Sequence, residues 1–363
     1  MKPFRVILSG GGTGGHIFPA LAIADALKRE SASTKILFVG ASDRMEMTRV
    51  PDAGYPIKGL WISGIKRNLS FQNLLFPFKL VASLYRSYLI LKKFKPQVVI
   101  GTGGFASGPL LYMATRLNIP SLIQEQNALP GITNRVLGKY VHRVCVAHQQ
   151  AEKFFSKNKM VLTGNPLRAE LTQSLLDSKK ARKLLGLEPN KVTLLVVGGS
   201  LGARRINDLL AEQAERITSQ NVQILWQCGK LYEKEFSRYE KKNIHVRAFL
   251  DDMSTAYAAA DLIISRAGAL AVSELCQVGK AVLFIPSPNV AENHQFKNAI
   301  AVAEKGAAIV IEEKELDKNF EKEIDELLTN ITLRSTLGGN IKKLAKSNAT
   351  ASIVEQVKAL VND

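Results

Sequence analysis

The sequence of 363 residues contains few cysteines and no long hydrophobic run. Cys145, Cys228 and Cys276 lie far apart, without a CxxC pair or Cys/His ligand spacing. This argues against a disulfide framework or a structural zinc site and favours a reducing compartment. No run approaches the ~18 consecutive apolar residues that a membrane-spanning helix needs. The opening MKPFRVILSGGG runs directly into a glycine turn, so we expect no signal peptide, and a protein that is soluble or binds a membrane surface.

Acidic residues are missing between Asp52 and Glu125. Residues 1–165 hold 22 Lys and Arg against 7 Asp and Glu, which is +15 of the formal net charge of +17. Within residues 65–95, basic residues alternate with Phe, Leu and Tyr. This pattern is typical of a surface that binds anionic lipid. An amphipathic helix packed on a sheet is an alternative. So is a nucleic-acid patch, but no RRM, KH, zinc-finger or recognition-helix signature supports it, so we expect no nucleic-acid partner.

Both halves of the chain contain short apolar strands that run into glycine-rich turns and then helices. Residues 4–9 lead into GGGTGG (10–15), and residues 191–197 lead into GGSLGA (198–203). A second such unit follows in each half, at 98–100 before GTGGFASG and at 262–264 before SRAGALAVSE. Fully apolar strands that alternate with helices indicate parallel sheets covered on both faces. We predict an α/β protein of two Rossmann-like doubly wound domains, with ligands at the carboxyl ends of the strands.

The length suits two domains, and a turn-rich break at Gly164-Asn165-Pro166 marks the predicted boundary. We predict an N-terminal domain of residues 1–164 and a C-terminal domain of residues 165–340. Residues 341–363 are predicted to form a terminal helix, from about Ile341 to Val361, that packs back on the N-terminal domain.

His16 stands where the first glycine turn becomes a helix, expected over residues 17–30. An imidazole pKa near 6.5 suits it to accept a proton at neutral pH. A histidine that only caps or packs the helix is the alternative. The spacing of Gly10, Gly12 and Gly15 also fits an NAD(P) dehydrogenase, but that class needs an acidic residue at the end of the second strand. Here the second strand ends in Gly-Ala-Ser, which argues against it.

Three positions in the second half suit a nucleotide diphosphate and its ribose. Ser200 and the amides after it form a natural anion site at a helix start. Arg266 follows a buried strand, and its planar guanidinium can bind two diphosphate oxygens. Glu274 lies eight residues further on and is suited to accept two ribose hydroxyls. Alternatively, the glycine turn at Ser200 binds no ligand, and Arg266 and Glu274 form a salt bridge at the surface.

Two polar clusters follow strands in equivalent positions of the two halves. They are AENHQ, with Asn293, His294 and Gln295, and QEQNALPG, with Glu125, Gln126 and Asn127. Their donors and acceptors suit the hydroxyls of a sugar, or alternatively satisfy the loop backbone.

Seven motifs, in their order along the chain, resemble those of the peptidoglycan N-acetylglucosaminyltransferases. They are GGGTGGHIFPALAIA, GGFASGP, QEQNALPG, GNPLR, GGSLGARRIN, SRAGALAVSE and AENHQ. The resemblance covers roughly residues 4–300 and implies the GT-B architecture, in which two Rossmann-like domains face each other across a cleft. It implies inverting transfer of N-acetylglucosamine from UDP-N-acetylglucosamine to the 4-hydroxyl of undecaprenyl-diphosphate-muramoyl-pentapeptide, which converts lipid I to lipid II. The N-terminal domain would hold this acceptor at the cytoplasmic face of the cell membrane, as a peripheral protein on an anionic surface, and the C-terminal domain the donor.

The resemblance also implies roles for single residues. His16 is the position proposed as general base, Leu250 would meet the uracil through its backbone, and Glu274 would bind the ribose. With Arg266 from the preceding argument, the predicted substrate-binding residues are Thr13, Gly14, Gly15, Asn127, Arg168, Ser200, Leu250, Arg266, Ala269, Leu270, Ala271, Val272, Ser273, Glu274 and Gln295. Two positions depart from some members: Leu201 replaces a Gln, and the loop 287–294 varies in sequence and length.

No metal or cofactor is expected. Arg266 and the amides near Ser200 can stabilise a departing UDP, and Asp251-Asp252 are adjacent rather than a DxD pair. Activity should therefore survive EDTA; complete loss that one divalent ion restores would overturn this expectation. The alternatives are a GT-B transferase with a diacylglycerol acceptor, a UDP-sugar epimerase on the same scaffold and, with least support, a non-enzymatic nucleotide-binding protein.

Overall fold

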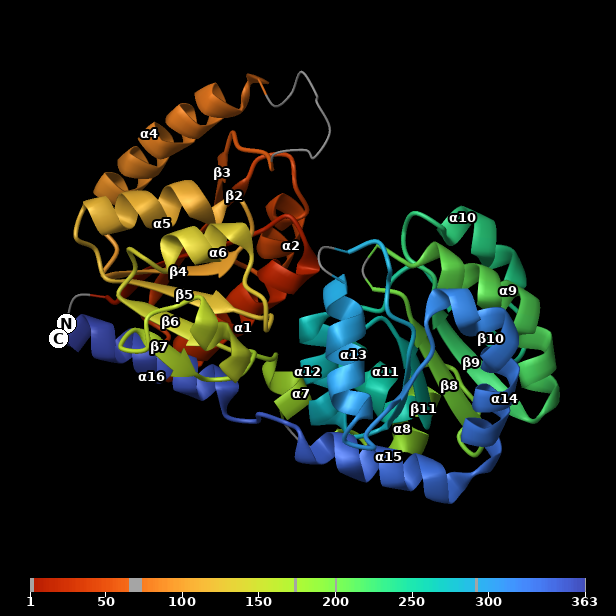
Figure 1. The fold of residues 1–363 in the computed structure, drawn as a ribbon. Helices are drawn as coiled ribbons and strands as arrows, with labels where there is room; N and C mark the ends of the chain where they lie inside the picture. The colour runs from red at the N-terminus through yellow and green to blue at the C-terminus, as the bar shows by residue number, and fades with distance from the viewer. Residues whose placement is uncertain (1–2, 65–73, 173–174, 200, 291–292, 363) are drawn as a thin grey trace. The chain divides into compact units, whose positions relative to one another are not determined.

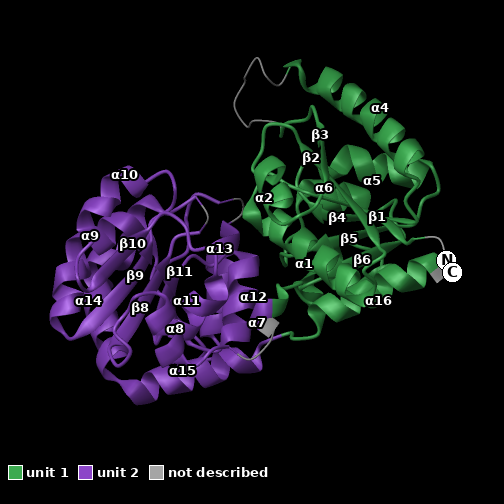
Figure 2. Cartoon of the chain, turned by 180° about the vertical axis from the view of Figure 1, so that it is seen from behind, with its two compact units in different colours: residues 1–169, 346–363 green, residues 170–345 purple. Residues whose placement is uncertain are grey.

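The computed structural model describes residues 3–64, 74–172, 175–199, 201–290 and 293–362. The chain forms two compact units, each built on one parallel sheet with helices on both faces (Figures 1 and 2). Unit 1 comprises residues 1–169 and 346–363, and unit 2 comprises residues 170–345. The predicted α/β class with two doubly wound domains is confirmed.

Unit 1 contains a seven-stranded sheet in the order β3-β2-β1-β4-β5-β6-β7. The strands are β1 (Arg5–Gly10), β2 (Lys35–Ala41), β3 (Ile57–Leu60), β4 (Val98–Gly103), β5 (Ser121–Glu125), β6 (Arg143–Val146) and β7 (Met160–Leu162). The helices are α1 (Gly14–Glu30), α2 (Glu46–Asp52), α4 (Phe76–Phe94), α5 (Ser107–Arg116), α6 (Ile132–Leu137), the 3₁₀ turn η1 (Gln149–Lys153) and α16 (Ala349–Asn362). Along β1, Val6 and Leu8 face one core and Ile7 faces the other, as expected of a strand buried on both faces.

Unit 2 contains a six-stranded sheet in the order β10-β9-β8-β11-β12-β13. The strands are β8 (Val192–Val197), β9 (Val222–Gln227), β10 (Ile244–Arg247), β11 (Leu262–Ser265), β12 (Ala281–Phe284) and β13 (Ile309–Val310). The helices are α8 (Ser178–Leu184), α9 (Arg204–Ser219), α10 (Glu233–Phe236), α11 (Met253–Ala259), α12 (Ala269–Val278), α13 (His294–Ala303), α14 (Leu316–Thr329) and α15 (Ile331–Lys343), with the 3₁₀ turns η2 (Ser237–Tyr239) and η4 (Glu313–Glu315). The short helix α7 (Ala169–Thr172) lies at the division between the units.

The division between the units differs from the predicted one at both crossings. Unit 1 continues to residue 169 rather than 164, and the Leu167 amide and carbonyl both bond the hydroxyl of Thr350 in α16. The single helix expected from about Ile341 is two helices: α15 ends at Lys343 and α16 begins at Ala349. Ser and Asn, at 347 and 348, favour caps over helix interiors. Helix α16 packs against α1 in unit 1, whereas α15 packs against α12 in unit 2.

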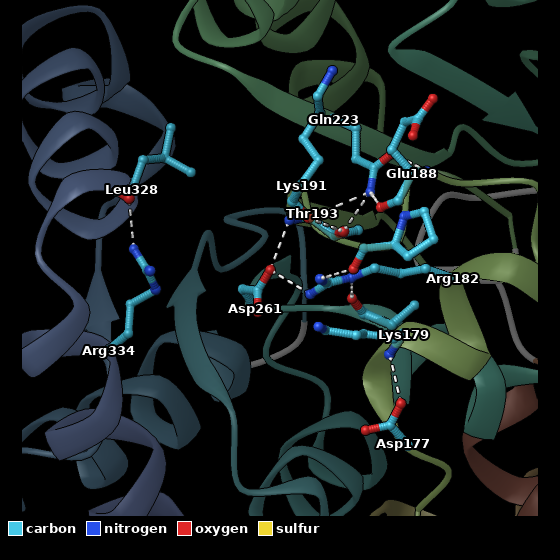
Figure 3. A network of polar contacts seen from close by, with 12 residues as sticks. Asp177, Lys179, Arg182, Glu188, Lys191, Thr193, Gln223, Asp261, Leu328 and Arg334 are labelled. Carbon is cyan, nitrogen blue, oxygen red and sulfur yellow. Dashed lines mark hydrogen bonds and ion pairs between the residues drawn. The ribbon is translucent and has the colours of Figure 1, made fainter.

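A buried polar network ties the amino ends of β8 and β11 to α8 (Figure 3). The Arg182 guanidinium donates to the Asp261 carboxylate at 2.6 Å and to the Ala259 and Pro189 carbonyls at 2.9 Å each. Asp261 also accepts the Thr193 amide at 2.8 Å. These bonds hold together elements of unit 2 at the amino ends of the strands, and the glycine turns lie at the opposite, carboxyl ends.

Candidate functional site

The first glycine turn lies where the strand order of unit 1 reverses, between β1 and β4. Such a crossover point is where doubly wound sheets bind ligands. A Cβ on Gly10 would collide with the Thr102 hydroxyl, and one on Gly104 would collide with the Gly11 carbonyl oxygen. The turns after β1 and β4 therefore pack backbone against backbone, and side chains are excluded there.

Helix α1 begins at Gly14, three residues before the start expected from its apolar spacing. Thr13 is the N-cap residue in extended conformation, and its side chain makes no capping hydrogen bond. Thr13 and Gly15 are exposed, and Gly14 is half-buried. The second half of the glycine run thus forms the first helical turn, with amide groups at the positive end of the helix dipole.

His16 lies in this first turn of α1, and its ring reaches the end of β4. Its Nδ1 is 3.0 Å from the Thr102 carbonyl oxygen and 3.2 Å from Gln126 Oε1. Because both partners are acceptors, Nδ1 carries the proton, and Nε2 of the neutral ring keeps its lone pair. A Cβ on Gly103 would lie 2.8 Å from Nδ1, so the ring needs glycine at that position. The tautomer that a base acting through Nε2 requires is therefore fixed by the fold.

Glu125 organises the loop that carries Asn127. It is the last residue of β5 and is buried, with Oε1 accepting the Asn127 backbone amide at 2.9 Å and its side-chain amide at 3.1 Å. Its Oε2 accepts from the Gly131 amide at 3.2 Å and from Asn134 Nδ2 at 2.9 Å. Glu125 thus accepts hydrogen bonds from the backbone and side chains of its own loop, which is the structural alternative given above for this cluster. Gln126, by contrast, contacts His16.

Glu46, which the sequence analysis did not single out, accepts a hydrogen bond from a backbone amide of the first glycine turn. It is fully buried at the start of α2, and its carboxylate accepts the Gly12 amide at 3.0 Å and the Ala41 amide at 2.9 Å. A Cβ on Gly11 would collide with this carboxylate. In dinucleotide-binding proteins the corresponding turn receives a pyrophosphate. A resident carboxylate at this turn adds a further argument against a dehydrogenase.

Replacing Glu46 with alanine should lower the free energy of unfolding by about 2–5 kcal/mol, because two buried N–H groups lose their acceptor. Urea unfolding followed by circular dichroism measures this change. Asp43→Ala is the matched control, since that side chain is 67% exposed, and it should change stability by less than about 0.5 kcal/mol. Equal stability of the two variants would show that the carboxylate does not hold the turn.

In unit 2 the strand order reverses between β8 and β11, and a cavity of about 530 Å³ lies there. It is lined by Gly198, Gly202, Ala203, Arg204, Arg205, Asp208, Tyr232, Arg266, Ser287, Asn289, Gln295 and Glu313. Ser200 lies outside the described residues. Helix α9 starts beside the cavity, and its N-cap residue Ala203 provides no side-chain cap. The amides of this helix start are suited to an anion.

Arg266 follows β11 and lines this cavity, as predicted from its position after a buried strand. Its Nη1 donates to the Ile285 carbonyl at 2.9 Å, which fixes the plane of the guanidinium. Its Nη2 lies 2.5 Å from Oε1 of Glu313. Glu313 belongs to the short turn η4, and nothing in the sequence pattern connected it with Arg266.

The remaining predicted contacts of unit 2 divide among three places. Gln295 lines the cavity, and its Oε1 accepts the Ser287 amide at 2.9 Å. Glu274, buried in α12, accepts a hydrogen bond of 3.1 Å from the Tyr257 hydroxyl. The Leu250 amide donates to Gln227 Oε1 at 2.9 Å. Leu250 does not line the cavity. Nor do the predicted contact residues in the first turns of α12, which are Ala269, Leu270, Ala271, Val272 and Ser273.

Arg168 belongs to unit 1, where its guanidinium lies 5.3 Å from the centroid of the Phe18 ring. Asp252 is the N-cap of α11, with its carboxylate accepting the Thr255 amide at 3.0 Å. Among the residues that the structure describes, no three His, Cys, Asp or Glu side chains gather as metal ligands would.

Two doubly wound units, with an arginine-lined cavity at the crossover of one and an oriented histidine at the crossover of the other, match the GT-B fold. Family models agree: the glycosyltransferase family 28 N-terminal domain matches residues 6–146 and the C-terminal domain matches residues 193–357. The chain therefore belongs to glycosyltransferase family 28 and is a hexosyltransferase.

Curated relatives narrow this class. A protein of Christiangramia forsetii is 55% identical over 99% of this chain and 98% of its own length. One of Flavobacterium psychrophilum is 52% identical over 99% of each. Both are named UDP-N-acetylglucosamine–N-acetylmuramyl-(pentapeptide) pyrophosphoryl-undecaprenol N-acetylglucosamine transferase. The chain belongs to the family of these transferases, and the resemblance found in its motifs is confirmed.

Solved structures agree with this assignment. The crystal structure of Acinetobacter baumannii MurG matches with a TM-score of 0.74 and 29% identity over 98% of this chain and all of that one. A UDP-GlcNAc 2-epimerase of Neisseria meningitidis matches with a TM-score of 0.66 at 15% identity over 98% of this chain and all of that one. This second likeness shows a shared fold alone.

Proposed function

We propose that the protein transfers N-acetylglucosamine from UDP-N-acetylglucosamine to the 4-hydroxyl of undecaprenyl-diphosphate-linked N-acetylmuramoyl-pentapeptide. The observation that carries the proposal is the name shared by relatives that are 43–55% identical over nearly the whole chain. The cavity beside α9 and the fixed tautomer of His16 supply the two chemical parts that this transfer needs.

Unit 2 is the proposed donor site. The donor diphosphate would sit at the start of α9, against the amides after Gly198 and the guanidinium of Arg266. Glu274 would accept the ribose hydroxyls, with Tyr257 holding its carboxylate in place. Since the Leu250 amide already donates to Gln227, the Leu250 carbonyl is the backbone group we assign to the uracil. Gln295 would bind the sugar.

Unit 1 is the proposed acceptor site and supplies the base. The acceptor oxygen attacks the anomeric carbon as the bond from that carbon to the diphosphate oxygen breaks, which inverts the configuration. The hydroxyl proton passes to Nε2 of His16, and the carbonyl of Thr102 and Oε1 of Gln126 stabilise the imidazolium through Nδ1. Stabilisation of the departing UDP by Arg266 and the helix start is expected to be the largest catalytic effect.

Helix α4 presents an apolar face to solvent, which we assign to the membrane that holds the acceptor. Phe78 and Tyr85 are 69% and 65% exposed, whereas the helix buries Ser83 and Ser87. Phe78, Val81, Tyr85 and Leu89, together with Leu74 and Leu75 just before the helix, form the α4 apolar face. The exposed cations Arg86, Lys92, Lys93 and Lys95 lie on the same helix or directly after it, with no acidic residue in the surrounding stretch. Apolar side chains beside cations suit an anionic bilayer.

The rest of the predicted membrane segment, residues 65–73, lies outside the described residues. Among the described helices, none combines the length and apolar character needed to cross a bilayer. On the basis of the exposed apolar residues and cations of α4, we propose peripheral attachment, at the cytoplasmic face that the resemblance of the motifs implies.

Replacing both Phe78 and Tyr85 with glutamate should reduce flotation with liposomes containing anionic lipid by at least about ten-fold, since two aromatic rings that would enter the bilayer are lost and two negative charges are added. Ile331→Glu is the matched control: that side chain is 72% exposed, but it belongs to unit 2, and flotation should be unchanged. Equal flotation of the double variant and the wild type would remove α4 as the docking face.

The function itself is tested with labelled UDP-N-acetylglucosamine and three assay mixtures. We expect label in the lipid fraction with undecaprenyl-diphosphate-muramoyl-pentapeptide and none with diacylglycerol. With no acceptor, we expect the donor to be recovered without epimerisation. Label on diacylglycerol, or appearance of the 2-epimer, would support the corresponding alternative and contradict the proposal.

A further inference from the structure

The donor cavity of unit 2 contains a carboxylate where an anionic ligand is expected. Glu313 pairs with Arg266 at 2.5 Å, and the two side chains are only 20% and 13% exposed. Both line the cavity together with the glycine turn after β8. The inference drawn from this pair rests on the proposed function, since it concerns the ligands of the same cavity.

The other arginines of the cavity are paired differently. Arg204, 53% exposed, bonds both oxygens of Glu235 at 2.6 and 2.9 Å, and Arg205 pairs with Asp317. Neither Glu235 nor Asp317 is a lining residue, but Arg204 also pairs at 3.0 Å with Asp208, which lines the cavity and is 36% exposed. Arg266 and Glu313 differ from Arg204 and Asp208 in that both members of the pair are largely shielded from solvent. A shielded charge pair is little screened by water and salt.

We propose that Glu313 sets the preference of the donor site for the substrate over the product. A diphosphate arriving at Arg266 takes the place of the Glu313 carboxylate on Nη2, while the Ile285 carbonyl keeps Nη1. The displaced carboxylate remains tethered to η4 at the cavity wall and repels the bound anion.

This repulsion acts unequally on the two ligands. UDP ends in a free terminal phosphate, whose second ionisation has a pKa near 6, so at pH 7.5 it carries about one more negative charge than the UDP-sugar. A fixed carboxylate therefore weakens binding of UDP more than that of UDP-N-acetylglucosamine. Glu313 is in this account a specificity-determining residue that favours product release.

A purely structural role for Glu313 predicts a different outcome. If the carboxylate only held Arg266 in place, its loss would weaken binding of both ligands by a similar factor. The ratio of the two dissociation constants therefore separates the two roles.

The test is isothermal titration of UDP and UDP-N-acetylglucosamine into wild type, Glu313→Gln and Glu312→Gln at pH 7.5. Glu312 is the matched control, because it is the adjacent acid and pairs with Lys314 rather than with Arg266. For Glu313→Gln we expect roughly ten-fold tighter UDP and about three-fold tighter UDP-N-acetylglucosamine. In activity assays, inhibition by added UDP should strengthen relative to KM in the same proportion.

An unchanged ratio of the two dissociation constants in Glu313→Gln, whether both rise, fall or stay the same, would overturn the inference while leaving the donor site intact. A changed ratio in Glu312→Gln of equal size would also overturn it. Failure of the wild type to bind either uridine ligand would remove the proposed function, and the inference with it.

Discussion

Replacing His16 with alanine should lower kcat by about 10²–10⁴-fold, the usual contribution of a general base. The dissociation constant for UDP should stay within about two-fold of the wild-type value, because the cavity that we assign to the nucleotide is lined by residues of unit 2. Single-turnover measurements with labelled donor separate these two effects.

The physical reason lies in the hydrogen bonds of the ring. The Thr102 carbonyl and Gln126 Oε1 fix the proton on Nδ1, so that Nε2 is the nitrogen able to take the acceptor proton. His142 offers a matched control in the same unit, since its Nδ1 accepts the Ser121 amide and it belongs to no predicted site. His142→Ala should keep kcat within about two-fold in the folded protein. An unchanged kcat in His16→Ala would exclude His16 as the base.

Replacing Arg266 with alanine is the second large effect, with an expected loss of about 10²–10³-fold in kcat. The guanidinium faces the cavity beside the α9 start, and charge develops on the leaving diphosphate as the sugar bond breaks. Arg266→Lys should recover only part of the activity, because an ammonium group cannot hold the Ile285 carbonyl and a phosphate in one plane.

Arg238 provides the comparison for this second prediction. It is an exposed arginine of unit 2 that stacks on Tyr239 and is not a lining residue of the cavity. Arg238→Ala should leave kcat and KM unchanged. If Arg266→Ala raised KM for the donor and left kcat at the wild-type value, Arg266 would bind the ground state and the transition state equally, and leaving-group stabilisation would have to come from the helix start.

The strands and the turns at their ends could be predicted because their signals are local. An apolar run such as residues 192–197, followed at once by glycines, has few interpretations other than a buried strand that ends in a tight turn. The same local signals predicted that Arg266 and His16 lie near the carboxyl ends of strands, where doubly wound sheets bind ligands. The alternation of basic and apolar residues along α4, without any acid, was also readable, but it left open whether the apolar residues pack on the sheet or face a membrane.

What the sequence did not reveal depends on contacts between distant segments. Glu46 reaches the first glycine turn from α2, and Glu313 reaches Arg266 from η4. Neither acid stands in a motif, and each acquires its role only when the sheet brings its element beside a turn. The early start of α1 at Gly14 is similar, because glycine is a poor helix former and tertiary packing overrides that preference.

These two acids bind different groups near the glycine turns of the two units. In unit 1 the carboxylate of Glu46 bonds backbone amides of Gly12 and Ala41 and is buried with them, so an incoming phosphate would have to break a structural contact. In unit 2 the carboxylate of Glu313 bonds a guanidinium at a cavity wall, where an anionic ligand can replace it. The nucleotide is therefore assigned to unit 2, although both turns are glycine-rich.

A crystal structure of the protein with bound UDP-N-acetylglucosamine tests this assignment most directly. We expect the diphosphate against residues 201–205 and Arg266, with the Gly12 amide still bonded to Glu46. A diphosphate bound to the amides of the turn at Gly10–Gly12, with Glu46 displaced, would contradict the account.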